Sequence, residues 1–116
     1  MPRMREIGRG QPVFTTEPVR GRLRVLEGPD DVLDLLDEEV TDAIVVVRDA
    51  GATFLTPMYH DLVGVICTAG TTRSHIGIVT REFQIPCVMG AELDELPEQL
   101  AEVELDCSGD VGFVRA

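Results

Sequence analysis

Apolar residues along this chain form short continuous or alternating runs that are typical of strands. Residues 43–47 and 62–67 are continuous and rich in β-branched side chains, the pattern of strands buried on both faces. Residues 21–26 alternate polar and apolar positions, which is typical of a strand with one buried face. The pattern predicts strands at residues 13–16, 21–26, 43–47, 62–67, 85–89, 103–106 and 112–115, the last two as a hairpin.

Helical signals lie between these runs. A helix is predicted from residue 28, where two acidic residues precede apolar positions at helical spacing. A loop and a short helix with Pro57 near its first turn are predicted within residues 51–61. A further helix opens at Ser74-His75, and residues 93–100 carry leucines at helical spacing that Pro97 divides into two turns.

Together these elements indicate a single α/β domain over residues 13–116, with a mixed sheet and short helices. Residues 1–12 are polar and include Gly8, Gly10 and Pro12, so we expect a flexible N-terminal segment. The native-looking Met1 and the compact ends favour a stand-alone chain over a domain cut from a longer enzyme.

Composition excludes several function classes. The formal net charge of −11 argues against binding to nucleic acid or to an anionic membrane surface, both of which need a basic footprint. No apolar run approaches the ~20 residues of a membrane span, and we expect a cytoplasmic location. The cysteines Cys67, Cys87 and Cys107 are predicted to be buried and reduced, and no metal site is predicted from the spacing of histidines and cysteines.

The chemistry is concentrated in residues 69–90, a Gly/Thr turn followed by a helix, an Ile-Pro pair and an apolar strand. The hydroxyl of Thr72 is a candidate helix cap. Ser74 and His75 then fall in the first turn of the helix, where unpaired backbone N–H groups form an anion site. An imidazole at this place is suited to carrying a phosphoryl group. The other histidine, His60, is predicted to have a surface or packing role.

This segment resembles the phosphohistidine motif of the phosphoenolpyruvate-utilising enzymes, of the pyruvate phosphate dikinase and phosphoenolpyruvate synthase type. The matching residues are Gly70, Ser74, His75, Ile78, Val79, Arg81, Glu82, Ile85, Pro86, Val88 and Gly90. The resemblance implies a three-layer β/β/α swivelling domain that carries phosphoryl groups between two active sites. One site belongs to an ATP-grasp nucleotide-binding subunit, and the other to a barrel subunit for phosphoenolpyruvate, pyruvate or another acceptor.

By the same resemblance, His75 is the nucleophile and Gly70 permits a close backbone approach. Thr72 and Ser74 would donate to the phosphate, and Arg73 would supply a counter-charge. Arg81 is assigned to a structural pair with a carboxylate. The chain lacks a Gly-rich nucleotide loop and any lysine, so it is incomplete as a kinase. It is expected to bind no cofactor, and ATP and Mg²⁺ would be bound by the partner subunits.

The motif also departs from the family pattern. Thr71 and Arg73 stand where the family has Gly or Ala and Thr, and Ile76-Gly77 replaces a pair of small residues. The alternative to a carrier is therefore a catalytically silent interaction module that kept the swivelling fold.

Overall fold

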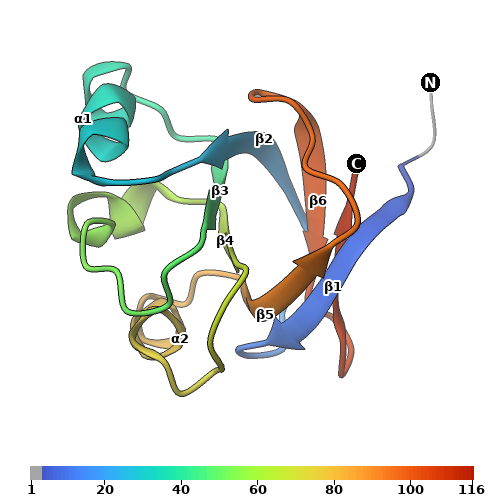
Figure 1. Ribbon diagram of the computed structural model, residues 1–116. Helices are drawn as coiled ribbons and strands as arrows, with labels where there is room; N and C mark the ends of the chain where they lie inside the picture. Colours follow the sequence, from blue (N-terminus) through green and yellow to red (C-terminus); the bar gives the residue numbers. More distant parts are fainter. Residues whose placement is uncertain (1–3) are drawn as a thin grey trace.

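The computed structural model describes residues 4–116 of the 116-residue chain. Within that range the chain forms seven strands, two α-helices and one 3₁₀ helix (Figure 1). The elements are β1 (Glu6–Pro12), β2 (Val19–Val25), α1 (Pro29–Asp37), β3 (Ala43–Val47), η1 (Thr56–Asp61), β4 (Gly64–Cys67), α2 (His75–Phe83), β5 (Cys87–Leu93), β6 (Glu102–Asp106) and β7 (Gly112–Arg115). No helix among these residues has the length and apolar character needed to cross a membrane.

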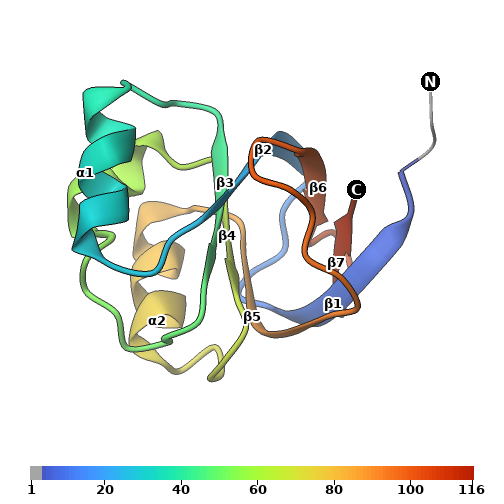
Figure 2. The same cartoon turned by 45° about the horizontal axis from the view of Figure 1, so that its top comes forward.

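The strands close into one barrel in the order β1-β5-β4-β3-β2-β6-β7, with β7 returning to β1. The pairs β2–β3, β3–β4 and β4–β5 are parallel, while all pairs that involve β1, β6 or β7 are antiparallel. The helices lie together on the outer side of the parallel strands, and β1, β6 and β7 lie on the opposite side (Figures 1 and 2). Parallel strands need such crossover connections, and the helices provide them.

The mixed α/β prediction is confirmed, but the two β layers of the expected three-layer arrangement are joined into a closed barrel. Strand β1 makes the closure because it pairs with both β5 and β7. The prediction of a flexible segment over residues 1–12 is therefore wrong for Glu6–Pro12, while residues 1–3 lie outside the described residues. Gly8 and Gly10 allow this strand to approach β5 closely, since a Cβ at either position would lie within 2.8 Å of a β5 carbonyl oxygen.

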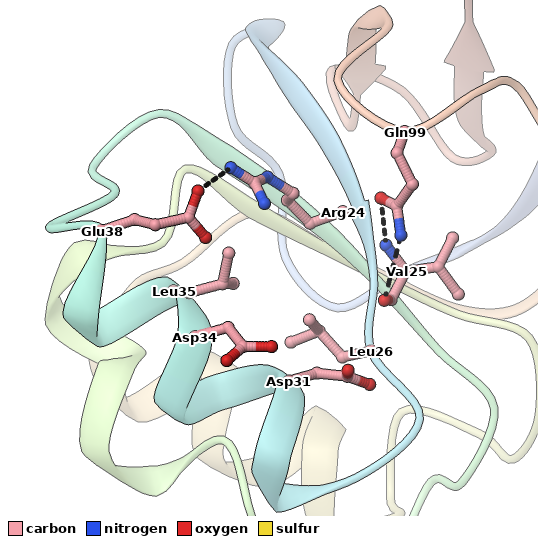
Figure 3. A pocket seen from close by; sticks show the side chains of 8 residues that line it. All are labelled: Arg24, Val25, Leu26, Asp31, Asp34, Leu35, Glu38 and Gln99. Atoms are coloured by element: carbon pink, nitrogen blue, oxygen red, sulfur yellow. Dashed lines mark hydrogen bonds and ion pairs between the residues drawn. The ribbon is translucent and has the colours of Figure 1, made fainter.

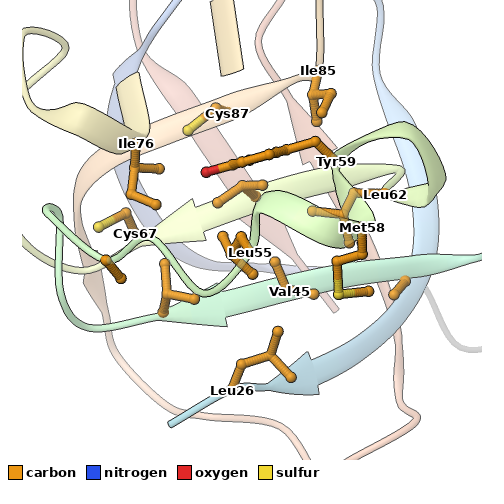
Figure 4. Close-up of a cluster of buried hydrophobic side chains, with 14 of the residues drawn as sticks. Leu26, Val45, Leu55, Met58, Tyr59, Leu62, Cys67, Ile76, Ile85 and Cys87 are labelled. Atoms are coloured by element: carbon orange, nitrogen blue, oxygen red, sulfur yellow. The ribbon is translucent and has the colours of Figure 1, made fainter. Parts of the chain in front are cut away.

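Two apolar clusters stabilise the domain, one on each face of the parallel strands. In β3, Val45 and Val47 face the cluster under the helices, while Ile44 and Val46 face the interior of the barrel. Figure 4 shows the helix-side cluster, in which Tyr59 from η1 reaches between Ile76 and Cys87. The prediction that residues 43–47 form a strand buried on both faces is confirmed, because all five are buried.

Most other element predictions are also confirmed, including both α-helices and the β6–β7 hairpin. The predicted strand at residues 13–16 is wrong, since these residues are irregular. Val13 N–H still donates to Cys87 O of β5 at 2.9 Å, and the Val13 side chain is buried in the helix-side cluster.

The two helical turns predicted within 93–100 are wrong in part: Leu93 lies in β5, and one turn is present after Pro97, where Ala101 N–H donates to Glu98 O at 3.1 Å. The segment is hydrogen-bonded to β2, where Leu100 N–H donates to Leu23 O at 2.9 Å. The helical spacing of its leucines does not reflect a buried face, because Leu96 and Leu100 are both exposed.

Candidate functional site

The turn between β4 and α2 is built from its own polar groups. The Ser74 hydroxyl oxygen accepts a hydrogen bond from Thr71 N–H at 3.0 Å, and Ser74 N–H donates to Thr71 O at 2.9 Å. Arg73 N–H donates to the Thr71 hydroxyl oxygen at 3.2 Å. Gly70 has a φ of +73°, and a Cβ there would lie 2.5 Å from the Ser74 oxygen. The turn thus needs glycine at residue 70 and holds Ser74 in a fixed place.

Helix α2 begins one residue after Ser74, which is the N-cap residue in place of the predicted Thr72. The Ser74 hydroxyl accepts from the turn and makes no bond to a helix amide. Ile76 N–H instead donates to Ala50 O at 3.0 Å, so the loop after β3 supports the start of α2. This loop was not recognised in the sequence as part of the site, although an Asp-x-Gly sequence after a buried strand is a turn signal.

His75 is the first residue of α2 and is exposed. Its own N–H has no backbone or side-chain acceptor within residues 4–116, as expected for the first turn of a helix. Arg73 is exposed two residues earlier and makes no ion pair in the described part of the chain. An imidazole, an open helix N-terminus and a guanidinium group therefore share one exposed end of the molecule.

The hydroxyl groups predicted to bind phosphate lie at the same end. Ser74 is half-buried, and its oxygen accepts one hydrogen bond while its own hydrogen stays available to an anion. Thr72 is also half-buried. Residues 70 and 72–75 are therefore brought together by one turn, and the arrangement offers a nucleophile beside anion-binding donors.

The residues at positions 76 and 77 face inward, away from the exposed surface of this turn. The Ile76 side chain is fully buried in the helix-side cluster. Gly77 packs against the turn itself, because a Cβ there would lie 2.5 Å from Thr72 O. Both residues thus face the interior of the fold, and neither covers His75.

Arg81 stabilises the fold, but its partner is different from the one predicted. Its Nη2 group donates to the carbonyl oxygen of Val13 at 2.6 Å, so the partner is a backbone carbonyl in place of a carboxylate. This bond ties α2 to the segment that connects β1 and β2. Sequence patterns could not indicate this bond, because the partner lies 68 residues away.

His60 has the predicted surface and packing role. It is exposed at the end of η1, and its ring makes an edge contact with Phe83 at a centroid distance of 4.9 Å.

The three cysteines are buried and free, as predicted. Burial raises the pKa of the Cys87 thiol to about 12 and that of Cys107 to about 11. These groups therefore stay protonated near neutral pH and are poor nucleophiles.

A separate hollow between β2 and α1 has polar walls (Figure 3). Its groups already bind one another: Arg24 lies 3.4 Å from Glu38, and the Gln99 side-chain oxygen accepts from Val25 N–H at 3.0 Å. None of its lining residues belongs to the turn that carries His75.

Comparison with known proteins agrees with this geometry. No curated protein matches the chain. A family model described as the mobile domain of PEP-utilising enzymes matches residues 40–109, more than half of the chain, and this range includes the whole turn and α2. The chain therefore belongs to the family of PEP-utilising enzyme mobile domains.

Proposed function

We propose that this chain is a phosphoryl carrier in which His75 accepts a phosphoryl group at one partner site and releases it at another. Membership of the mobile-domain family implies a carrier role. The observation that supports His75 as the acceptor is its exposure at the first position of α2, beside Arg73, which makes no ion pair with any of residues 4–116. A carrier must present its nucleophile to another protein, and His75 is presented in this way.

The proposed reaction is a two-step displacement. A ring nitrogen of His75 attacks phosphorus, an N–P bond forms, and the bond from phosphorus to the donor's leaving oxygen breaks. The ring gives up its remaining N–H proton to solvent as the positive charge of the phosphorylated imidazole is relieved. In the second step an acceptor oxygen attacks the same phosphorus and the N–P bond breaks, while the ring takes up a proton from solvent and so leaves as neutral imidazole. The Ser74 hydroxyl, the His75 amide and Arg73 would stabilise the negative oxygens in both steps.

The partners we propose are an ATP-grasp nucleotide-binding subunit and a subunit for phosphoenolpyruvate, pyruvate or a related acceptor. ATP and Mg²⁺ would be held there. The formal charge of −11 favours partner clefts with a basic rim, so association should weaken as salt increases. The cytoplasm, where nucleotides and phosphoenolpyruvate are available, is the proposed location.

The silent-module alternative rests on the departures from the family pattern around His75. Of the residues that differ, Ile76 and Gly77 are turned into the fold, whereas Arg73 is exposed beside the histidine. A guanidinium group at that place is compatible with binding an anion. The carrier is therefore favoured over the silent module.

The test is phosphoryl labelling in an extract of the protein's own cells. Wild-type protein, His75→Ala and His60→Ala are incubated with labelled ATP or labelled phosphoenolpyruvate and analysed at alkaline pH. His60 is the matched control because it is the other histidine of the chain and is also exposed. We expect alkali-stable, acid-labile label on wild type and on His60→Ala, and none on His75→Ala.

Label that persists on His75→Ala would exclude His75 as the acceptor. Absence of label from wild type with either donor, in an extract shown to contain the partner enzymes, would favour the silent module.

A further inference from the structure

We infer that Ile78 forms an apolar docking contact for the protein that delivers the phosphoryl group to His75; this inference rests on the proposed function. Ile78 is 53% exposed on α2, whereas the other exposed large apolar residue of this helix, Phe83 (39% exposed), packs against the rings of Tyr59 and His60. Ile76 on the same helix is fully buried and Val79 is half-buried against the core. The packing of the domain therefore does not account for an isoleucine at residue 78.

The position of Ile78 relative to His75 indicates that the phosphoryl-delivering protein is the one that contacts it. Residues three apart on a helix have Cβ atoms about 5–6 Å apart and share one face. A donor phosphorus has to come within roughly 3–3.5 Å of the histidine ring before the N–P bond can form. A protein that holds the donor at that distance cannot avoid contact with a side chain one helical turn away, so Ile78 becomes buried each time His75 is phosphorylated.

The surroundings of His75 suit such a close approach. The turn before α2 carries only small side chains at residues 69–72, and Gly90 lies against it, with Gly90 N–H donating to Ala69 O at 3.2 Å. The long exposed side chain nearest in sequence is that of Arg73, which makes no ion pair within residues 4–116 and can point to the phosphoryl group. The partner surface predicted by this arrangement is apolar opposite Ile78, with the anionic donor opposite Arg73.

The experiment compares Ile78→Ser with Leu33→Ser. Leu33 is 57% exposed on α1, so the two variants remove aliphatic side chains of nearly equal exposure from different helices. The initial rate of His75 labelling in cell extract is measured against the concentration of each chain, with the donor that labels wild type. Reaction with phosphoramidate, a small phosphoryl donor that needs no docking, is measured in parallel, and the oligomeric state of each chain is determined by light scattering.

We expect the KM of Ile78→Ser as the phosphoryl-accepting chain to rise roughly tenfold, because a half-exposed isoleucine loses its burial in the complex. The KM of Leu33→Ser should equal that of wild type, and all three chains should react equally with phosphoramidate. A KM for Ile78→Ser that equals that of wild type would overturn the docking contact while the carrier role stands. Slower reaction of Ile78→Ser with phosphoramidate would overturn it too, since the residue would then act on His75 itself.

A wild-type dimer that Ile78→Ser dissociates would assign the contact to a second copy of the chain and would also overturn the inference. Absence of wild-type label from both biological donors would instead remove the proposed function, and with it the docking contact.

Discussion

Gly77→Ala is the substitution for which the structure makes the sharpest prediction. Alanine in place of glycine within a helix ordinarily stabilises a protein by about 0.5–1 kcal/mol, because the unfolded chain loses freedom and the helix is favoured. Gly77 lies in the first turn of α2 and faces the backbone of Thr72. Here the added methyl group should reverse the ordinary sign.

The magnitude follows from the space available. The methyl carbon would lie 2.5 Å from Thr72 O, 2.8 Å from its carbonyl carbon and 3.0 Å from its Cα. A carbon–oxygen contact normally requires about 3.3 Å, so the turn has to move by roughly 0.8 Å. The obstructing atoms belong to the backbone and cannot be relieved by a side-chain rotation. Overpacking of this kind costs about 1–3 kcal/mol, and after the helix gain of about 0.5–1 kcal/mol is subtracted we expect a net destabilisation centred on about 1 kcal/mol.

The assay is urea unfolding of wild type, Gly77→Ala and Gly109→Ala, analysed for the midpoint and the slope. Gly109 is the control because a Cβ there meets nothing within 4 Å, so its free energy of unfolding should change by less than about 0.5 kcal/mol. The same displacement should move Thr72 relative to His75 and slow the labelling of His75. If Gly77→Ala unfolds at the same or a higher urea concentration than wild type, the close packing of the turn on α2 is refuted.

Three further predictions concern the site and its support. Ser74→Ala removes the acceptor of the Thr71 amide, so it should cost about 0.5–1.5 kcal/mol in urea unfolding and slow the labelling of His75; an unchanged labelling rate would contradict the phosphate-binding role. Arg81→Met keeps the aliphatic stem but loses the bond to Val13 O, and we expect a loss of about 1–2 kcal/mol, with an unchanged urea midpoint as the contrary result. Burial raises the pKa of Tyr59, the only tyrosine, to about 12, above the value of about 10 expected in the unfolded chain. Its contribution to stability is therefore complete below pH 10 and is lost as the pH rises from 10 to 12; the phenolate absorbance of the folded protein should show this, and a midpoint near 10 would contradict it.

The sequence by itself determined the elements that local patterning controls. The β-branched run at residues 43–47 has no polar position, so it can only be a strand buried on both faces, and the structure has it so. The turn and the helix of the site were predicted because they too depend on local sequence. Gly70, Ser74 and His75 are close in sequence, and the constraints on them are backbone geometry and helix-end chemistry within a few residues.

Only the tertiary structure decided what distant segments contribute. Residues 6–12 are polar and glycine-rich, a composition typical of a connector, yet they form the strand that closes the barrel. Their backbone groups form hydrogen bonds with β5 and β7, which lie about 80 residues or more further along the chain. The pattern of side chains does not indicate such distant partners.

The same reason explains why the partner of Arg81 and the role of the Ala50 carbonyl were missed. Both are contacts between a side chain or amide of α2 and a backbone oxygen from another part of the chain. Every residue has a backbone carbonyl oxygen, so the amino-acid sequence does not show which of these oxygens will accept the hydrogen bond. The exposure of Ile78 is also a tertiary property, because the helical pattern alone could not say which apolar residue the core would leave at the surface.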